Sequence, residues 1–92
     1  MTIKIRFFAR FRELLGTDIV IEAPKGKTLL DLITDIAKKN KDGYDAIFDE
    51  KGELREFVIL MQNGKRLETA DAKKIKVADG DEIAVFPPVA GG

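Results

Sequence analysis

The chain has 92 residues, in which 16 Lys and Arg balance 16 Asp and Glu, and it contains no Cys and no His. A chain of this length forms one domain with one modest core, and without Cys or His it lacks disulfides, thiolate nucleophiles, imidazole bases and most kinds of zinc site. The net charge of zero argues against nucleic acid or an anionic membrane as the main partner, because both are bound largely through a basic field.

The N-terminal segment "TIKIRFF" alternates apolar and polar residues, which predicts a strand with one buried face. Ile3, Ile5 and Phe7 would point into the core, whereas Phe8 breaks the pattern and falls on the opposite face. "ARFRELLG" then predicts a short helical turn that ends at Gly16. "TDIVIEA" predicts a second strand, antiparallel to the first.

The start of the chain is charged and alternating, which is not the pattern of a signal peptide. No apolar run approaches the roughly 20 residues that a membrane-spanning helix needs. We therefore expect a cytoplasmic protein that works without a membrane.

The segment "TLLDLITDIAKKN" carries the strongest helix pattern in the chain. Thr28 is suited to cap the helix, with Asp31 three residues later. The apolar residues at helical spacing are Leu29, Leu32, Ile33 and Ile36. The next segment, "KDGYDAIFDEKGELRE", is predicted to be a long connection with at most one turn at 46–48.

Three further strands are predicted in the second half of the chain. "FVILMQ" is continuously apolar, which favours a place inside the sheet. Asn63-Gly64 is a strong hairpin signal, so "KRLE" is the return strand, and a loop with a turn at Asp79-Gly80 leads to the last strand, "EIAVF". The order predicts an α+β domain, a mixed sheet of about five strands with one main helix on one face and the other face comparatively open.

Two charged clusters have ordinary structural explanations. Arginine interleaved with phenylalanine at 6–12 could bind single-stranded nucleic acid, but Phe7 and Phe11 belong to the core pattern, so this function is disfavoured. The acidic stretches "DEKGE" and "DGDE" could suggest a metal or acid–base site. They lack a nucleophile or an orienting partner, and turn residues are the favoured interpretation.

Phe8 and Phe86 both fall on the face opposite the core residues of their strands. If the first and last strands are neighbours, the two rings would cluster beside Arg12 and form a partner-binding patch. The alternative is that the connection at 41–56 covers this face.

The C-terminus "FPPVAGG" gives the sharpest functional signal. We expect a folded domain at 1–86 and an extended tail at 87–92. Pro87 and Pro88 would end the sheet pairing and keep the chain extended, and Val89 offers one apolar contact. Gly91 and Gly92 lack Cβ atoms, so this backbone could enter a narrow channel and present only the α-carboxylate of Gly92. The alternative is a frayed end without function.

The segments "KIRFFARFRELLG", "FDEKGELREFVILMQNG" and "DGDEIAVFPPVAGG" together resemble the MoaD-type sulfur carriers, relatives of ThiS among the ubiquitin-like β-grasp proteins. The likeness runs along essentially the whole chain. The chain is similar to small archaeal modifier proteins as well. "FVILMQNG" is more apolar, and "ETADAKKIKVA" richer in lysine, than the usual family pattern. These departures bear on which partner the chain binds more than on the chemistry at Gly92.

The resemblance implies a protein that is not itself an enzyme and binds no cofactor. A separate ATP-dependent activating enzyme (MoeB-like) adenylates Gly92, and a sulfurtransferase or persulfide donor converts it to a thiocarboxylate. The tail then enters the large molybdopterin synthase subunit (MoaE-like), with Gly91 as its threading neighbour. Phe8, Arg12 and Phe86 fall at positions associated with the partner-facing surface, next to Pro87, Pro88 and Val89.

Two other functions fit the same sequence. In a protein modifier, lysines of target proteins would attack the same activated Gly92 and form an isopeptide bond. In a plain β-grasp interaction domain, the tail would have no chemical role.

Overall fold

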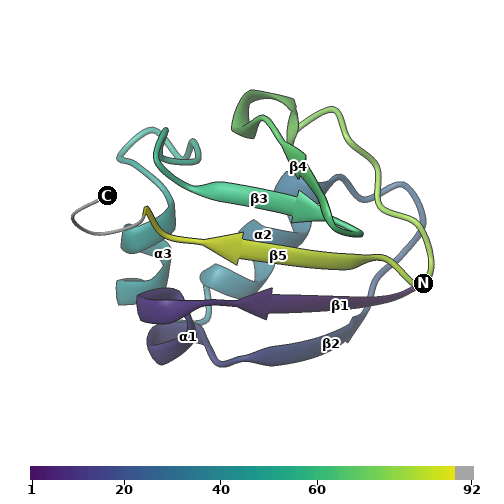
Figure 1. Cartoon of the computed structure of the whole chain (residues 1–92), viewed down its shortest axis with the longest axis horizontal. Helices are drawn as coiled ribbons and strands as arrows, with labels where there is room; N and C mark the ends of the chain where they lie inside the picture. The colour runs from purple at the N-terminus through teal and green to yellow at the C-terminus, as the bar shows by residue number, and fades with distance from the viewer. Residues whose placement is uncertain (89–92) are drawn as a thin grey trace.

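A computed structural model describes residues 1–88, so the predicted tail residues Val89, Gly91 and Gly92 lie outside the described residues. Within 1–88 the chain forms one five-stranded sheet in the order β2-β1-β5-β3-β4 (Figure 1). The strands are β1 Thr2–Phe7, β2 Asp18–Glu22, β3 Ile59–Gln62, β4 Lys65–Leu67 and β5 Glu82–Phe86. The helices are α1 Ala9–Leu15, α2 Leu29–Ala37 and α3 Lys41–Ile47, with a 3-10 turn at Thr69–Asp71.

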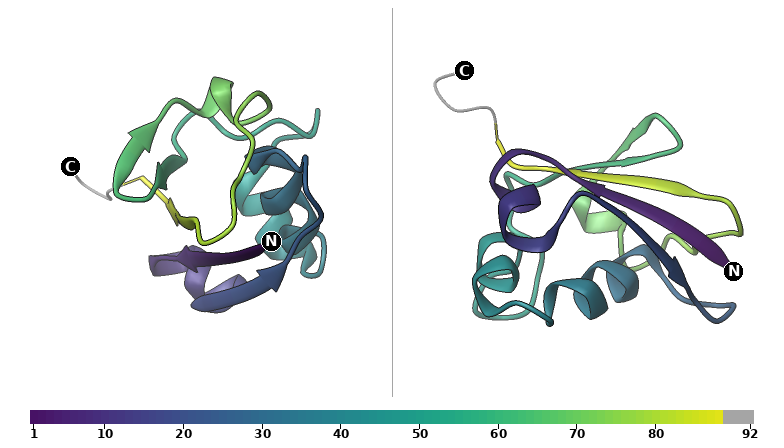
Figure 2. Two further views of the ribbon diagram at one scale, coloured as in Figure 1. Left: turned by 90° about the vertical axis from the view of Figure 1, so that its right-hand side faces the viewer. Right: turned by 90° about the horizontal axis from the view of Figure 1, so that it is seen from below.

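The sheet is mixed, as expected for an α+β domain. β1 and β5 pair in parallel at its centre, while β1 with β2, β3 with β4 and β3 with β5 pair antiparallel. The three helices lie on the same side of the sheet (Figure 2). The predicted single main helix is therefore joined by α1 and α3, and the other face of the sheet carries no helix from residues 1–88.

The core lies between the sheet and the helices. Alternate residues of β1 and β5 point into it, and the apolar stripe of α2 packs against them. The predicted core residues are buried, with Ile3, Ile5, Phe7 and Phe11 each 2% exposed or less. In the part of the chain that the structure covers, no helix is long and apolar enough to cross a bilayer.

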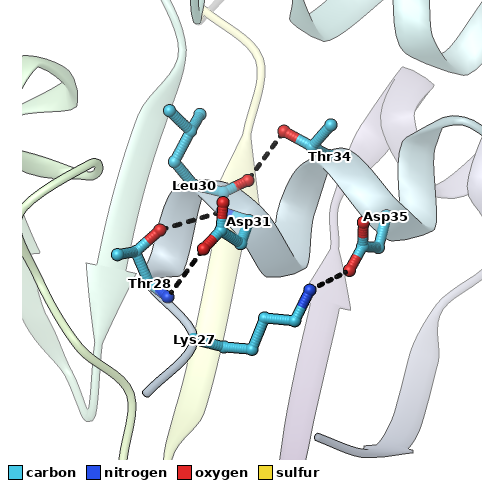
Figure 3. A network of polar contacts seen from close by, with 6 residues as sticks. All are labelled: Lys27, Thr28, Leu30, Asp31, Thr34 and Asp35. Carbon is cyan, nitrogen blue, oxygen red and sulfur yellow. Dashed lines mark hydrogen bonds and ion pairs between the residues drawn. The ribbon is translucent and has the colours of Figure 1, made fainter. Parts of the chain in front are cut away.

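The helix α2 begins at the predicted capping box (Figure 3). The Oγ1 of Thr28 accepts a hydrogen bond from the backbone N–H of Asp31 at 3.1 Å, and the Asp31 carboxylate accepts one from the N–H of Thr28 at 3.2 Å. The hydrogen bonds from Thr28 lower the pKa of Asp31. Lys27 and Asp35 add an ion pair of 3.1 Å along the first turns.

The hairpin predicted at Asn63-Gly64 is present, and both residues have positive φ (51° and 83°), as a tight two-residue turn requires. The acidic residue Asp81 holds this hairpin against β5. Its carboxylate accepts hydrogen bonds from Gln62 at 3.0 Å, from Asn63 at 2.9 Å and from the N–H of Ala78 at 2.8 Å. The acidic turn residues therefore have the structural role that the sequence favours.

The prediction of a connection at 41–56 is wrong in its first half, which forms α3. Asn40 caps this helix with its side chain, and Gly43 and Ile47 are buried. The helix α3 contacts α1 and α2. The alternative, in which this segment covers the open face of the sheet, is therefore wrong.

Candidate functional site

The end of β5 is the part of the candidate site that the structure places. β5 ends at Phe86, and Pro87 and Pro88 follow outside any strand, half-buried and exposed, respectively. The residues predicted to carry the chemistry, Gly91 and Gly92, lie beyond the described part. The described part of the site is thus the surface from which the tail begins.

Phe8 and Phe86 stack on each other at this point. Their ring centroids are 4.2 Å apart and the ring planes differ by 10°. The stack forms because β1 runs parallel to β5, and the N–H of Phe8 continues the pairing with a 3.1 Å hydrogen bond to the carbonyl of Val85. The expected clustering of the two rings is confirmed, and their role in binding a partner stays a prediction.

The open face also holds apolar residues that the sequence analysis did not assign to it. Ile59 is paired with Phe86 across the β3–β5 ladder, and Met61 is paired with Ala84. All four are half-buried, while the alternate residue Leu60 is in the core. We define the apolar patch as Phe8, Ile59, Met61, Ala84 and Phe86. The continuous apolar run "FVILMQ" hides this alternation, so only the register reveals it.

Arg12 lies at the edge of the apolar patch. A shallow hollow of about 190 Å³ is lined by Phe8, Arg12, Arg6 and Asp18 together with Phe7 and Thr17. Arg6 is held by Asp18, with 2.9 Å between Nε and Oδ1, and this hydrogen bond raises the pKa of Arg6 and lowers that of Asp18. Arg12 is exposed and takes part in no ion pair within residues 1–88. Its charge is therefore available to an acidic group of a partner.

A strained residue connects the stack to α1. Ala9 has φ of +52°, in the left-handed region that costs a residue with a Cβ about 1 kcal/mol or more. This conformation turns the chain from β1 into α1 directly after Phe8. The strain is thus located between the two groups predicted to contact a partner, Phe8 and Arg12.

The larger hollow of about 270 Å³ lies between α2, the segment 53–56 and the 3-10 turn. Its charged residues are Glu53, Glu56 and Lys73, which are exposed. Neither hollow combines a nucleophile with a positioned base, the arrangement that covalent catalysis needs. Within residues 1–88 these two hollows thus offer no catalytic constellation, and the reactive role of the tail stays a prediction.

Comparison with known proteins gives full-length matches. The sequence model of the ThiS family matches residues 5–92. Small archaeal modifier protein 3 of Haloferax volcanii is 34% identical over 93 residues, covering all of both chains. The molybdopterin synthase sulfur carrier subunit of Escherichia coli is 31% identical over 94 residues, covering 98% of this chain and 99% of that one. The crystal structure of SAMP1 from Haloferax volcanii matches with a TM-score of 0.86 at 26% identity over all of both chains, which confirms the expected ubiquitin-like β-grasp fold.

Proposed function

Because the chain belongs to the ThiS family, we propose that it is a sulfur carrier that donates sulfur in molybdopterin biosynthesis, as the small subunit of a molybdopterin synthase. The observation that carries the proposal is the position of the apolar patch. The stacked Phe8–Phe86 pair lies immediately before Pro87, so the docking surface leads directly into the tail. The full-length match to a sulfur carrier subunit supports the same function.

The first step activates the carboxylate of Gly92. A carboxylate is a poor electrophile, since the group that leaves would be oxide. A separate ATP-dependent enzyme joins the carboxylate oxygen to the α-phosphorus of ATP, and pyrophosphate leaves with the electron pair. The acyl-adenylate then has AMP as a good leaving group. This chain supplies the substrate and the docking surface in this step, and ATP is bound by the partner.

The second step introduces sulfur. The terminal sulfur of a donor persulfide attacks the acyl carbon, and AMP leaves. A thiol then reduces the resulting acyl disulfide by two electrons, which gives the thiocarboxylate and a disulfide. In the large synthase subunit the thiocarboxylate sulfur attacks a carbon of a cyclic pterin precursor, an oxygen leaving group departs from that carbon with the electron pair, and a thioester forms. Hydrolysis of the thioester leaves the sulfur on the pterin and returns the carboxylate of Gly92.

The named residues have separate roles in this scheme. The apolar patch binds a partner by excluding water, and Arg12 pairs with an acidic group at its edge. Pro87 and Pro88 keep the chain extended beyond β5, and Val89 makes one apolar contact. Gly91 and Gly92 fit a channel too narrow for side chains. We propose that these steps take place in the cytoplasm.

A second function is favoured by one finding, the full-length match to small archaeal modifier protein 3. In a modifier, the ε-amine of a target lysine attacks the activated carbonyl of Gly92, and an isopeptide bond forms as the leaving group departs. The activation step is common to both functions. The acceptor of Gly92 distinguishes them.

Complementation tests the sulfur-carrier function. We expect the chain, together with its activating enzyme and large subunit, to restore molybdoenzyme activity in a strain that lacks its own carrier. The matched control lacks only Gly91 and Gly92 and should fail. Equal restoration by this control would refute the proposal. Failure of the intact chain, accompanied by lysine adducts that depend on ATP, would favour the modifier.

A further inference from the structure

Asn40 links the end of α1 to the beginning of α3. Its Nδ2 donates a hydrogen bond to the carbonyl oxygen of Leu14 at 2.7 Å, and its Oδ1 accepts one from the N–H of Gly43 at 3.1 Å. The last carbonyls and the first N–H groups of a helix lack partners within the helix. The half-buried side-chain amide of Asn40 thus provides a hydrogen-bond partner for one backbone group at the end of α1 and for one at the beginning of α3.

The two helices also approach closely beside Asn40. Gly43 is buried, and a Cβ built on it would lie 2.5 Å from Cδ2 of Leu15, the last residue of α1. Such a distance is far below van der Waals contact. The last turn of α1 therefore lies directly against α3.

The helix α1 is short, and contacts at its two ends add to the burial of Phe11. It has seven residues, no side-chain hydrogen bond caps its N-terminus, and Phe11 is its buried residue. Isolated helices of this length are unstable in water. Its N-terminal end is fixed through Phe8, which stacks on Phe86 of β5, and its C-terminal end through Asn40.

Arg12 lies between these two anchors, in the last turn of α1. Its position at the edge of the apolar patch therefore depends on both anchors. We propose that Asn40 is a positioning residue, which acts through α1 to keep Arg12 in place for binding the activating enzyme. This inference rests on the proposed function, because it assumes that the activating enzyme docks on the patch.

Two substitutions separate the roles of Asn40. Asn40→Asp keeps an oxygen for the N–H of Gly43 and removes the donor to the carbonyl of Leu14. Asn40→Ser also keeps an N-cap oxygen, adds no charge, and is too short to reach Leu14. The matched control is Thr34→Val, which removes the 2.7 Å hydrogen bond from Thr34 to the carbonyl of Leu30 (Figure 3). Both residues belong to α2, on the side of the sheet opposite the open face that carries the patch (Figure 2).

The assay is ATP–pyrophosphate exchange by the cognate activating enzyme, measured as a function of carrier concentration. We expect both Asn40 variants to raise the half-saturating concentration about threefold to tenfold, the effect of one lost hydrogen bond, with the maximal rate unchanged. Thr34→Val should saturate the enzyme like the wild type. In an Arg12→Ala background, the Asn40 variants should have no further effect, because Arg12 is the group that Asn40 positions.

Other outcomes separate the inference from the proposed function. Wild-type half-saturation by a folded Asn40→Ser chain, or an equal effect with and without Arg12, would overturn the positioning role. If Asn40→Asp does not fold, the Asn40→Ser chain decides the question. The proposed function would instead be refuted if the wild-type chain supports no ATP–pyrophosphate exchange with an enzyme that is shown to activate another carrier.

Discussion

The buried carboxylate of Asp81 joins the β3–β4 hairpin to β5, and Asp81→Asn should weaken the fold strongly. The side chain is 8% exposed. Gln62 and the N–H of Ala78 donate to Oδ2, while Asn63 donates to Oδ1. An amide has one oxygen, so it can serve one of these two positions. At least one part-buried donor would then face an NH₂ group that cannot accept its hydrogen bond.

The magnitude follows from these contacts. Leaving a buried donor unsatisfied costs about 1–3 kcal/mol, and hydrogen bonds to a charged group are stronger than those to an amide. We expect the free energy of unfolding to fall by about 2–4 kcal/mol in total. For a domain of this size, each kcal/mol lowers the melting temperature by about 4–8 °C. Asp81→Asn should therefore lower it by about 8–32 °C.

The effect should depend on pH. Burial raises the pKa of Asp81, but the hydrogen bonds from Ala78, Asn63 and Gln62 outweigh it, and the pKa in the folded chain is lowered. A lowered pKa means stabilisation that is complete above the unfolded value of about 3.9 and is lost as the pH falls through the folded value. The difference between wild type and variant should thus be constant from about pH 7 to 5 and narrow below about pH 4.

Urea denaturation at several pH values measures both quantities. Asp79→Asn is the matched control, because Asp79 is an exposed residue of the same turn whose carboxylate accepts one 2.7 Å hydrogen bond, from the N–H of Thr2. This control should cost under about 1 kcal/mol. The reasoning from burial and charge would be refuted if the two variants lose equal free energies of unfolding. It would also be refuted if the difference in free energy between wild type and Asp81→Asn stays the same in acid.

Three further variants address the candidate site. Phe86→Ala should lower partner affinity by about 1–3 kcal/mol and the free energy of unfolding by less, and paired calorimetry and melting in which stability falls more would assign the ring to the fold. Gly43→Ala should destabilise the fold by about 1–3 kcal/mol in chemical denaturation, because its Cβ would overlap the side chain of Leu15, and unchanged stability would contradict the close contact of α1 with α3. Deleting Gly91 and Gly92 should leave the melting temperature unchanged and abolish adenylation, so adenylation of the shortened chain would contradict the role of the tail.

Local patterns in the sequence predict the elements whose signals are local. The helix α2 begins where Thr28 and Asp31 can cap each other, and the hairpin turns at Asn63-Gly64, where positive φ is needed. The alternation in "TIKIRFF" correctly assigns Phe7 to the core. In each case the residues that determine the structure are neighbours in the chain.

The helix α3 could not be predicted in this way. Asp42 and Gly43 have low helix propensity, and the segment has few apolar residues at helical spacing. The helix forms because Asn40 caps it and because it packs against α1 and α2. These contacts join parts of the chain that are distant in sequence.

The candidate site could be predicted only in part, because it too depends on contacts between strands that are distant in sequence. Strand alternation places Phe8 and Phe86 on the open face, but their stacking requires β1 and β5 to be parallel neighbours. Ile59 and Met61 join the patch through the register of β3 with β5, and no periodicity marks them. The roles of Gly91 and Gly92 come from sequence alone and stay predictions.

The intact mass of the protein tests the central claim most directly. The chain is incubated with ATP, its cognate activating enzyme and a sulfur donor, and the product is fragmented to locate any change. We predict a mass increase that corresponds to the exchange of one oxygen for one sulfur, located at Gly92. An unchanged mass, with an enzyme shown to thiolate another carrier under the same conditions, would contradict the sulfur-carrier function.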